Sequence, residues 1–145
     1  MLTRSIVGLI GLLSVVLGIA AQEPGYRYDT AGVQLQGTLV RRQVYGPPGF
    51  GETPAQDERG AILVLKLSQP ITVRPASQVV EKDNPNADVF KNVREVQLFI
   101  PRNAEHGVDK LVGRVVLASG VLHEHVAPAE YTDVWMDVKT ISVSH

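Results

Sequence analysis

The sequence predicts a mainly β fold in one small domain. Short apolar runs alternate with polar residues, which is the period of a half-buried strand, and glycine- and proline-rich stretches separate these runs. The 145 residues are 44% hydrophobic and 20% charged, a composition that suits a globular chain able to bury a core without staples.

The first 21 residues have the order of a secretory signal peptide. Arg4 supplies positive charge, residues 6–17 are apolar throughout, and small residues precede Gln22. An uncleaved anchor is the alternative, but a membrane-spanning helix needs about 20 apolar residues, more than this segment offers. We therefore predict a signal peptide at 1–21, a lead-in segment at 22–32 and a domain at 33–145, with a periplasmic or secreted location and no stable membrane anchor after cleavage.

Five strands are expected in the mature chain. Gly37 and Gly120 interrupt the first and fourth, where a glycine often marks a bulge or a sharp bend. Residues 103–112 predict a short helix, with Asn103 as its N-cap. Long loops are expected at 46–60 and 74–92. The predicted strands are 33–44, 61–67 with a continuation at 71–73, 93–100, 114–125 and 131–143.

This order of elements matches the plan of an OB-fold, a small five-stranded barrel. The predicted helix lies between the third and fourth strands, and a first strand broken by Gly37 fits strong coiling. Barrel closure also removes the exposed edges that an open sheet would leave. The sequence therefore predicts an OB-like barrel with one short helix, preceded by a signal peptide.

Five short motifs occur in an order that resembles a bacterial family of exported proteins with an uncharacterised domain, domain of unknown function 4431. The resemblance covers residues 37–141 and implies an exported OB-like domain of no known activity. In that family the segment after the fourth strand is rich in histidine, whereas this chain keeps His123 and His125 and continues with Val126. The motifs are Gly37-Thr38-Leu39, Gly46-Pro47-Pro48, Leu65-x-Leu67-x-x-Pro70-Ile71, Leu111-Val112-Gly113 and Gly120-x-Leu122-x-x-His125.

Two histidines form the sharpest candidate metal site. His123 and His125 lie two residues apart on a predicted strand, so their imidazoles project from one face and could share a divalent ion. Glu130 or Asp133 could add a third ligand across the following turn. The alternative is a polar strand end whose histidines are solvated or hydrogen-bonded.

Three aromatic residues are candidate ligand contacts. An OB-fold binds its ligands over its second and third strands and the adjoining loops. Phe50 lies in the first long loop, with Tyr45 before it and Tyr131 after the fourth strand. Such rings could stack on sugars or bases, or they could simply bury area on the barrel.

Composition narrows the classes of function. The formal net charge of −1 and the scattered basic residues argue against nucleic acid as a partner. The absence of cysteine excludes disulfides and thiolate catalysis, and neither a nucleophile elbow nor a phosphate-binding loop occurs. We expect no catalytic residues and no cofactor, and a non-catalytic binding domain for an envelope protein or polymer. The alternatives are a divalent-metal protein, an inhibitor or immunity protein against an envelope hydrolase, and a small envelope hydrolase.

Overall fold

The computed structural model describes residues 22–76, 88–103 and 107–145. The predicted signal peptide, part of the predicted loop at 74–92 and part of the predicted helix lie outside these residues. In the described part of the chain, six strands and one 3₁₀ turn form the regular structure. They are β1 (Gly25–Arg27), β2 (Val33–Tyr45), β3 (Arg59–Arg74), β4 (Phe90–Phe99), the 3₁₀ turn η1 (Val108–Leu111), β5 (Val115–Glu124) and β6 (Val134–Val143).

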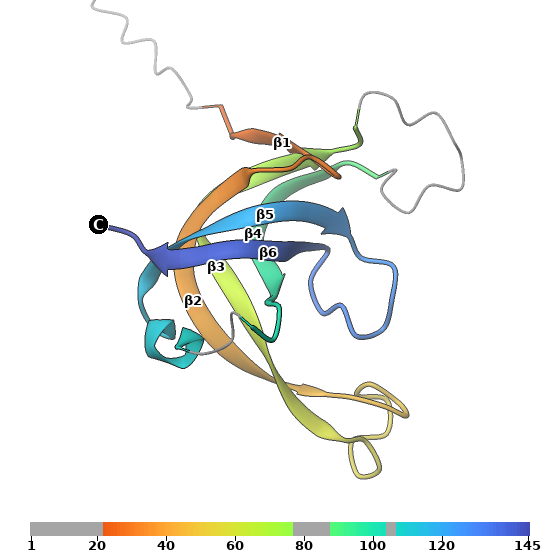
Figure 1. The fold of residues 1–145 in the computed structure, drawn as a ribbon. Helices are drawn as coiled ribbons and strands as arrows, with labels where there is room; N and C mark the ends of the chain where they lie inside the picture. Colours follow the sequence, from red (N-terminus) through yellow and green to blue (C-terminus); the bar gives the residue numbers. More distant parts are fainter. Residues whose placement is uncertain (1–21, 77–87, 104–106) are drawn as a thin grey trace, which may run out of the picture.

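Strands β2 to β6 close into a five-stranded barrel (Figure 1). Around the barrel, β3 pairs with β2, β2 with β5, β5 with β6, β6 with β4, and β4 again with β3. All of these pairings are antiparallel except that of β4 with β6. This is the connectivity of an OB-like barrel, so the mainly β class and the closed barrel are confirmed.

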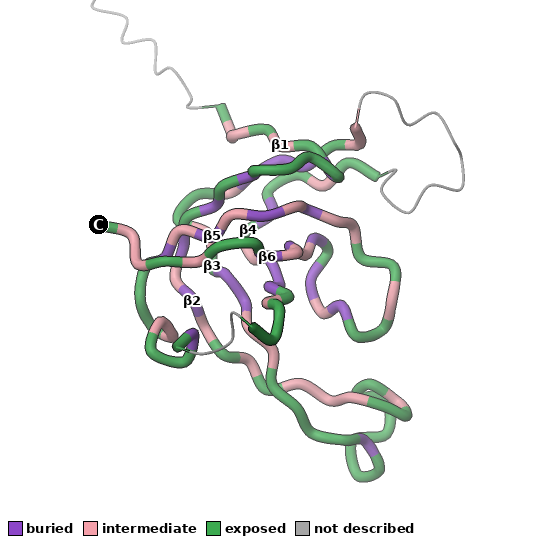
Figure 2. The backbone as a smooth tube through the Cα atoms, in the orientation of Figure 1, coloured by how far each residue is buried: buried purple, intermediate pink, exposed green. Residues whose placement is uncertain are grey.

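The core follows from the alternation of each strand. Leu35 and Leu39 of β2, Leu65 of β3, Leu122 of β5 and Met136 of β6 are at most 2% exposed and belong to one apolar cluster. Figure 2 shows buried segments alternating with partly buried and exposed ones along the strands of the barrel. Val108 of η1 joins the same cluster. The barrel interior is therefore filled by side chains rather than open.

The two glycines predicted to interrupt strands have different roles. At Gly37, β2 pairs with both β3 and β5, and a Cβ atom would lie 2.2 Å from the Lys66 carbonyl oxygen. The ladders show no register shift there, so Gly37 permits close approach rather than a bulge. At Gly120 the β5–β6 register does shift, and a Cβ would lie 2.1 Å from the Asp137 oxygen. The β5–β6 ladder is therefore irregular beside Gly120, but the extra residue is Lys139 of β6, so the bulge lies in the partner strand rather than at Gly120 itself.

The predicted helix at 103–112 is not found in the described part of that segment. One 3₁₀ turn, η1, stands between β4 and β5, and Gly107 rather than Asn103 precedes it. Gly107 has φ of 96° and Gly113 has φ of 84°, so left-handed residues lie on both sides of the turn. Glycines in this conformation limit the helical stretch to a single turn.

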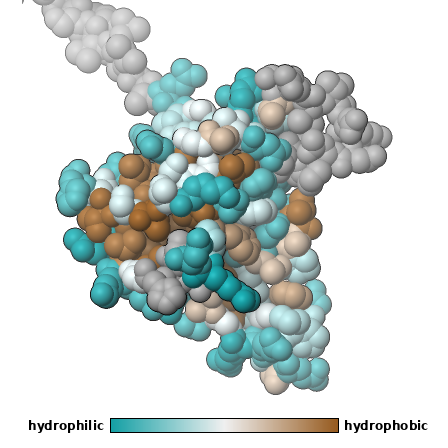
Figure 3. Space-filling model, viewed as in Figure 1, coloured by the Kyte–Doolittle hydropathy of each residue, from teal (hydrophilic) through white to brown (hydrophobic). Residues whose placement is uncertain are grey.

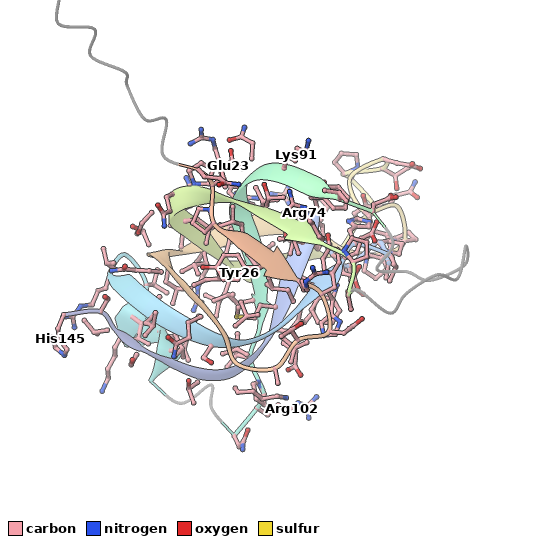
Figure 4. The ribbon with its side chains drawn as sticks, turned by 90° about the horizontal axis from the view of Figure 1, so that it is seen from above. Glu23, Tyr26, Arg74, Lys91, Arg102 and His145 are labelled. Carbon is pink, nitrogen blue, oxygen red and sulfur yellow. The ribbon has the colours of Figure 1, made fainter. Side chains whose placement is uncertain are left out.

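The segment predicted as a lead-in contributes a strand that the sequence did not indicate. β1 pairs in parallel with the end of β3, and Tyr28, which follows it, is fully buried in the core. Glu23 accepts a hydrogen bond from the Thr72 hydroxyl at 2.9 Å and one from the backbone N–H of Asn92 at 3.3 Å. Figure 4 shows Glu23 beside the ends of β3 and β4. The described residues before 33, from Glu23 to Tyr28, are thus tied to the barrel.

β2 and β3 extend beyond the barrel as a two-stranded ribbon, paired as far as Tyr45 and Arg59. Residues 46–58 connect them, and we call these residues the hairpin lobe. Figure 1 shows this ribbon projecting from the barrel. Figure 3 shows a mostly hydrophilic surface on it, whereas apolar side chains gather over the barrel body. The lobe therefore stands out as a polar projection at one end of the barrel.

Candidate ligand-binding cleft

The face over β3 and β4, where OB-folds usually bind ligands, is covered at its centre by the β5–β6 loop. Gln97 of β4 is only 2% exposed. Its side-chain amide donates to the Ala129 carbonyl at 3.2 Å and accepts from the Tyr131 N–H at 2.6 Å. Its backbone N–H donates to the Thr132 hydroxyl at 2.9 Å. The loop is fixed on β4 by these bonds and closes that part of the face.

An ion pair covers the neighbouring part of the same face. Arg42 of β2 lies 2.5 Å from the Glu95 carboxylate of β4. In the sheet register Val64 lies between these strands, opposite Val40 and Gln97, and it is fully buried although it is on the outer side. A ligand therefore meets a closed surface at the middle of β3 and β4.

Glu130 shapes the β5–β6 loop from within. One of its carboxylate oxygens accepts hydrogen bonds from the backbone N–H groups of Val126 at 2.5 Å and Ala127 at 3.0 Å. The residue is 8% exposed. The sequence made Glu130 a candidate metal ligand. In the structure its carboxylate stabilises a turn of its own loop, and the backbone N–H donors compensate its charge.

The remaining metal candidates do not gather around one point. The His123 Nδ1 lies 3.2 Å from the Asp29 carboxylate, and its ring stacks on Trp135 with centroids 4.3 Å apart. His125 uses its backbone N–H to bond the Asp133 carbonyl at 3.0 Å. Within the described residues, no group of three or more His, Cys, Asp or Glu side chains is placed to hold a metal ion. Metal binding by His123 and His125 stays a prediction.

Two of the three aromatic candidates meet at the base of the hairpin lobe, and the third lies within the lobe. The Tyr131 hydroxyl donates to the Tyr45 carbonyl at 2.5 Å, which ties the β5–β6 loop to the ribbon. The Arg59 guanidinium lies 5.3 Å from the centre of the Tyr45 ring. Phe50 is farther along the lobe, in a left-handed conformation with φ of 48°, and is exposed. Tyr131 and Tyr45 are thus brought together by a bond that is internal to the fold.

A buried carboxylate organises the lobe itself. Asp57 accepts hydrogen bonds from the backbone N–H groups of Gly49 and Gly51, both at 2.7 Å, and from the Thr53 hydroxyl at 2.9 Å. Burial opposes the charge on Asp57, but these donors outweigh it and hold the pKa of the carboxyl below its ordinary value. The long loop at 46–58 is therefore a defined structure rather than a loose connection.

One hollow lies where the covered face ends, at the end of the barrel beside η1. It has a volume of about 690 Å³. Apolar side chains from β3, from β4 and its following residue, and from η1 form its walls, and Arg41 lies in it with its guanidinium paired to Asp109. The apolar members are Ala61, Ile62, Leu63, Leu98, Phe99, Ile100 and Val108. We call this hollow the fork cleft.

The fork cleft combines an apolar lining with one surface ion pair, which a ligand could replace. Arg41 and Asp109 are on the surface, with side chains 45% and 80% exposed, and an exposed pair of this kind contributes about 0–1 kcal/mol. A ligand carboxylate could therefore replace Asp109 on Arg41 at little cost. Phe99, which packs edge-on against Trp135 with centroids 5.0 Å apart, presents its outer side to the cleft.

Sequence reasoning missed the residues of this cleft. The sequence patterns did not indicate Arg41, Phe99, Gln97 or Asp109 as site residues. Phe99 carried a usable signal, because it is a large apolar residue at an outward position between Leu98 and Ile100. For Gln97 the sequence holds no such signal, since its partners are more than 30 residues away.

Comparison with known proteins finds no matching family model, no matching curated protein and no matching solved structure. Within residues 22–76, 88–103 and 107–145, no helix has the length and apolar character needed to cross a bilayer.

Proposed function

We propose that this protein is an exported, non-catalytic binding domain that holds part of an envelope protein or polymer in the fork cleft. The signal-peptide pattern of residues 1–21 supports export. The observation that carries the proposal is the cleft itself, a hollow of about 690 Å³ with apolar walls and one cation. Ligand sites are typically concave and mostly apolar, with a few placed polar groups.

A protein or polymer suits the fork cleft better as a ligand than a small metabolite does. The cleft is open at the end of the barrel, next to a ribbon that projects beyond it (Figure 1). A segment of a larger ligand could fill the cleft while the rest lies along the ribbon and the hairpin lobe. An inhibitor or immunity protein, which binds an envelope hydrolase, is a special case of this function. Membership of the family with domain of unknown function 4431 fits an exported domain and stays a prediction.

Capture from an envelope extract tests the proposal with two matched variants. Ile62→Asp places a charge in the cleft wall, whereas Val126→Asp places the same charge on the exposed β5–β6 loop, outside the cleft lining. We expect immobilised wild type and Val126→Asp to retain the same partner and Ile62→Asp to lose it. Circular dichroism checks that both variants fold. A partner retained equally by all three would place binding elsewhere and reject the cleft.

A further inference from the structure

The fork cleft exists because β3 and β4 stop pairing before either strand reaches its end on that side. Their last register pair toward the hairpin lobe is Leu63 with Leu98. β3 continues to Arg59 in the ribbon, but β4 ends at Phe99 and is followed by Ile100 and Pro101. Proline lacks a backbone N–H and terminates strands. One edge of β3 is therefore left without a neighbouring strand beside the cleft.

The backbone of Ala61 faces this empty position. The N–H and C=O of Leu39 bond residues 114 and 113 on the side away from β3. The backbone N–H and C=O of its register partner Leu65 must then point away from β2 and toward β4. Because this direction repeats at every second residue, the backbone groups of Leu63 and Ala61 point toward β4 as well. Leu63 meets Leu98, but the register gives no residue of β4 opposite Ala61. A backbone donor and an acceptor are thus presented at the cleft.

Three arginines lie near this edge, and the acidic residues beside them are Asp109 and Glu58, which precedes Arg59 in the chain. Arg41 lies in the cleft, Arg59 lies two residues from Ala61, and Arg102 lies two residues beyond Ile100. Figure 4 shows Arg102 at the margin of the molecule. Among the described residues that line the cleft, Asp109 is the acidic one, and it is already paired with Arg41. A segment that enters here meets more cationic than anionic side chains.

We propose that an extended acidic segment of a partner protein adds to β3 at Ala61 as an extra strand, in the place that β4 leaves empty. Addition of a strand to a free sheet edge supplies backbone hydrogen bonds for affinity and pockets for alternate side chains. The apolar side chains of the segment enter the cleft toward Leu63 and Ile100, and its carboxylates meet Arg41 and Arg59. This inference rests on the proposed function and names the ligand class and binding mode of the same cleft.

Two proline variants isolate the backbone contact. Ala61→Pro deletes the N–H that faces the cleft and leaves the β2–β3 bonds intact, because that N–H points away from β2. Gln43→Pro is the matched control: Gln43 is the register partner of Ala61, and its N–H faces outward on the opposite edge of the ribbon. The probe is the tightest peptide obtained from a displayed peptide library selected on the purified wild-type protein. We expect Ala61→Pro to weaken it by about tenfold, Gln43→Pro to leave it unchanged, and the selected sequences to be rich in Asp and Glu.

Backbone N-methylation of the selected peptide separates this inference from the proposed function. Methylation of the N–H groups at alternate residues should abolish binding, and methylation at the intervening residues should leave it. A peptide that is lost on Ile62→Asp but ignores both N-methylation and Ala61→Pro would keep the proposed function and overturn strand addition. Peptides insensitive to Ile62→Asp would overturn both. Self-association of the protein that is lost on Ala61→Pro, seen by sedimentation, would make a second copy the occupant and reject the acidic partner.

Discussion

Asp57 gives the hairpin lobe its shape, and it does so only while it is ionised. Its two carboxylate oxygens hold the N–H groups of Gly49 and Gly51 on one side of the lobe. Because these bonds lower its pKa in the folded state, the stabilisation is fully present above the ordinary value of 3.8 and is lost as the pH falls toward the folded pKa. The lobe should therefore loosen in acid while the barrel persists.

Amide NMR signals of Gly49 and Gly51 provide the measurement. We expect both to move toward random-coil positions as the pH falls below 3.8 and through the lowered pKa of Asp57, together with faster hydrogen exchange in the lobe, while amides of β5 and β6 keep their shifts. Asp57→Asn, which cannot ionise, should show the loosened lobe at neutral pH and no acid transition there. An acid transition of the same size in Asp57→Asn would assign it to another group.

Tyr28 carries a polar atom that the fold leaves unsatisfied. Its ring is fully buried, and its hydroxyl has no hydrogen-bond partner among the described residues. Burial raises the pKa of this phenol, and the nearby carboxylates Glu124, Asp88 and Asp133 add to the effect. Removal of a buried hydroxyl without a partner is neutral or favourable. We expect Tyr28→Phe to keep or raise the free energy of unfolding in urea by up to about 1 kcal/mol. A loss above about 1 kcal/mol would indicate a bound water or another partner for the hydroxyl.

At the scale of the elements, β2 depends on a position without a side chain. Gly37 lies where β2 pairs with two strands at once, and an added methyl group would meet the Lys66 backbone. We expect Gly37→Ala to lower the free energy of unfolding by about 3 kcal/mol, because backbone cannot move aside as a flexible side chain can. Gly60→Ala is the control: its methyl group would meet nothing within 4 Å, and we expect it to change stability by less than about 1 kcal/mol. Equal effects of the two changes in urea unfolding would show that propensity, rather than close approach, decides the loss.

The long strands could be read from sequence because each buries one face. Alternating apolar residues indicated β2, β4, β5 and β6, and the barrel plan followed from their order. β1 could not be read in this way, since a strand of 3 residues is too short to show a period. β3 runs through Pro70 because at that point it passes from its pairing with β2 to its pairing with β1, so no partner needs the missing N–H.

At the scale of the whole molecule, the sites depend on contacts that no local pattern reports. The sequence pointed to Phe50, Tyr45 and Tyr131 as ligand contacts on or beside loops. Hydrogen bonds within the protein hold those loops in place: Asp57 holds the hairpin lobe, and Glu130 and Gln97 hold the β5–β6 loop. The fork cleft arises instead where β3 and β4 separate, which depends on where two strands that are far apart in the sequence end. Local periodicity fixes which residues face a core, and it leaves the relative lengths of neighbouring strands undetermined.

The N-terminal segment tests how far the domain extends. A signal peptide that is cleaved after Ala21 leaves Glu23, β1 and Tyr28 on the mature chain, and all three contact the barrel. A chain that begins at Gln22 should therefore be fully stable, whereas a chain that begins at Thr30 loses the Tyr28 ring from the core. Loss of a buried aromatic ring costs about 3–5 kcal/mol, a large part of the total stability of about 5–15 kcal/mol expected for a domain. We expect the melting temperature of the shorter chain to fall by more than about 10 °C. Equal melting temperatures would show that the barrel is complete from residue 33 and that β1 is an appendage. The expected fall in melting temperature would instead make residues 22–32 part of the domain. Cleavage of the signal peptide would then occur within a few residues of a strand that the fold needs.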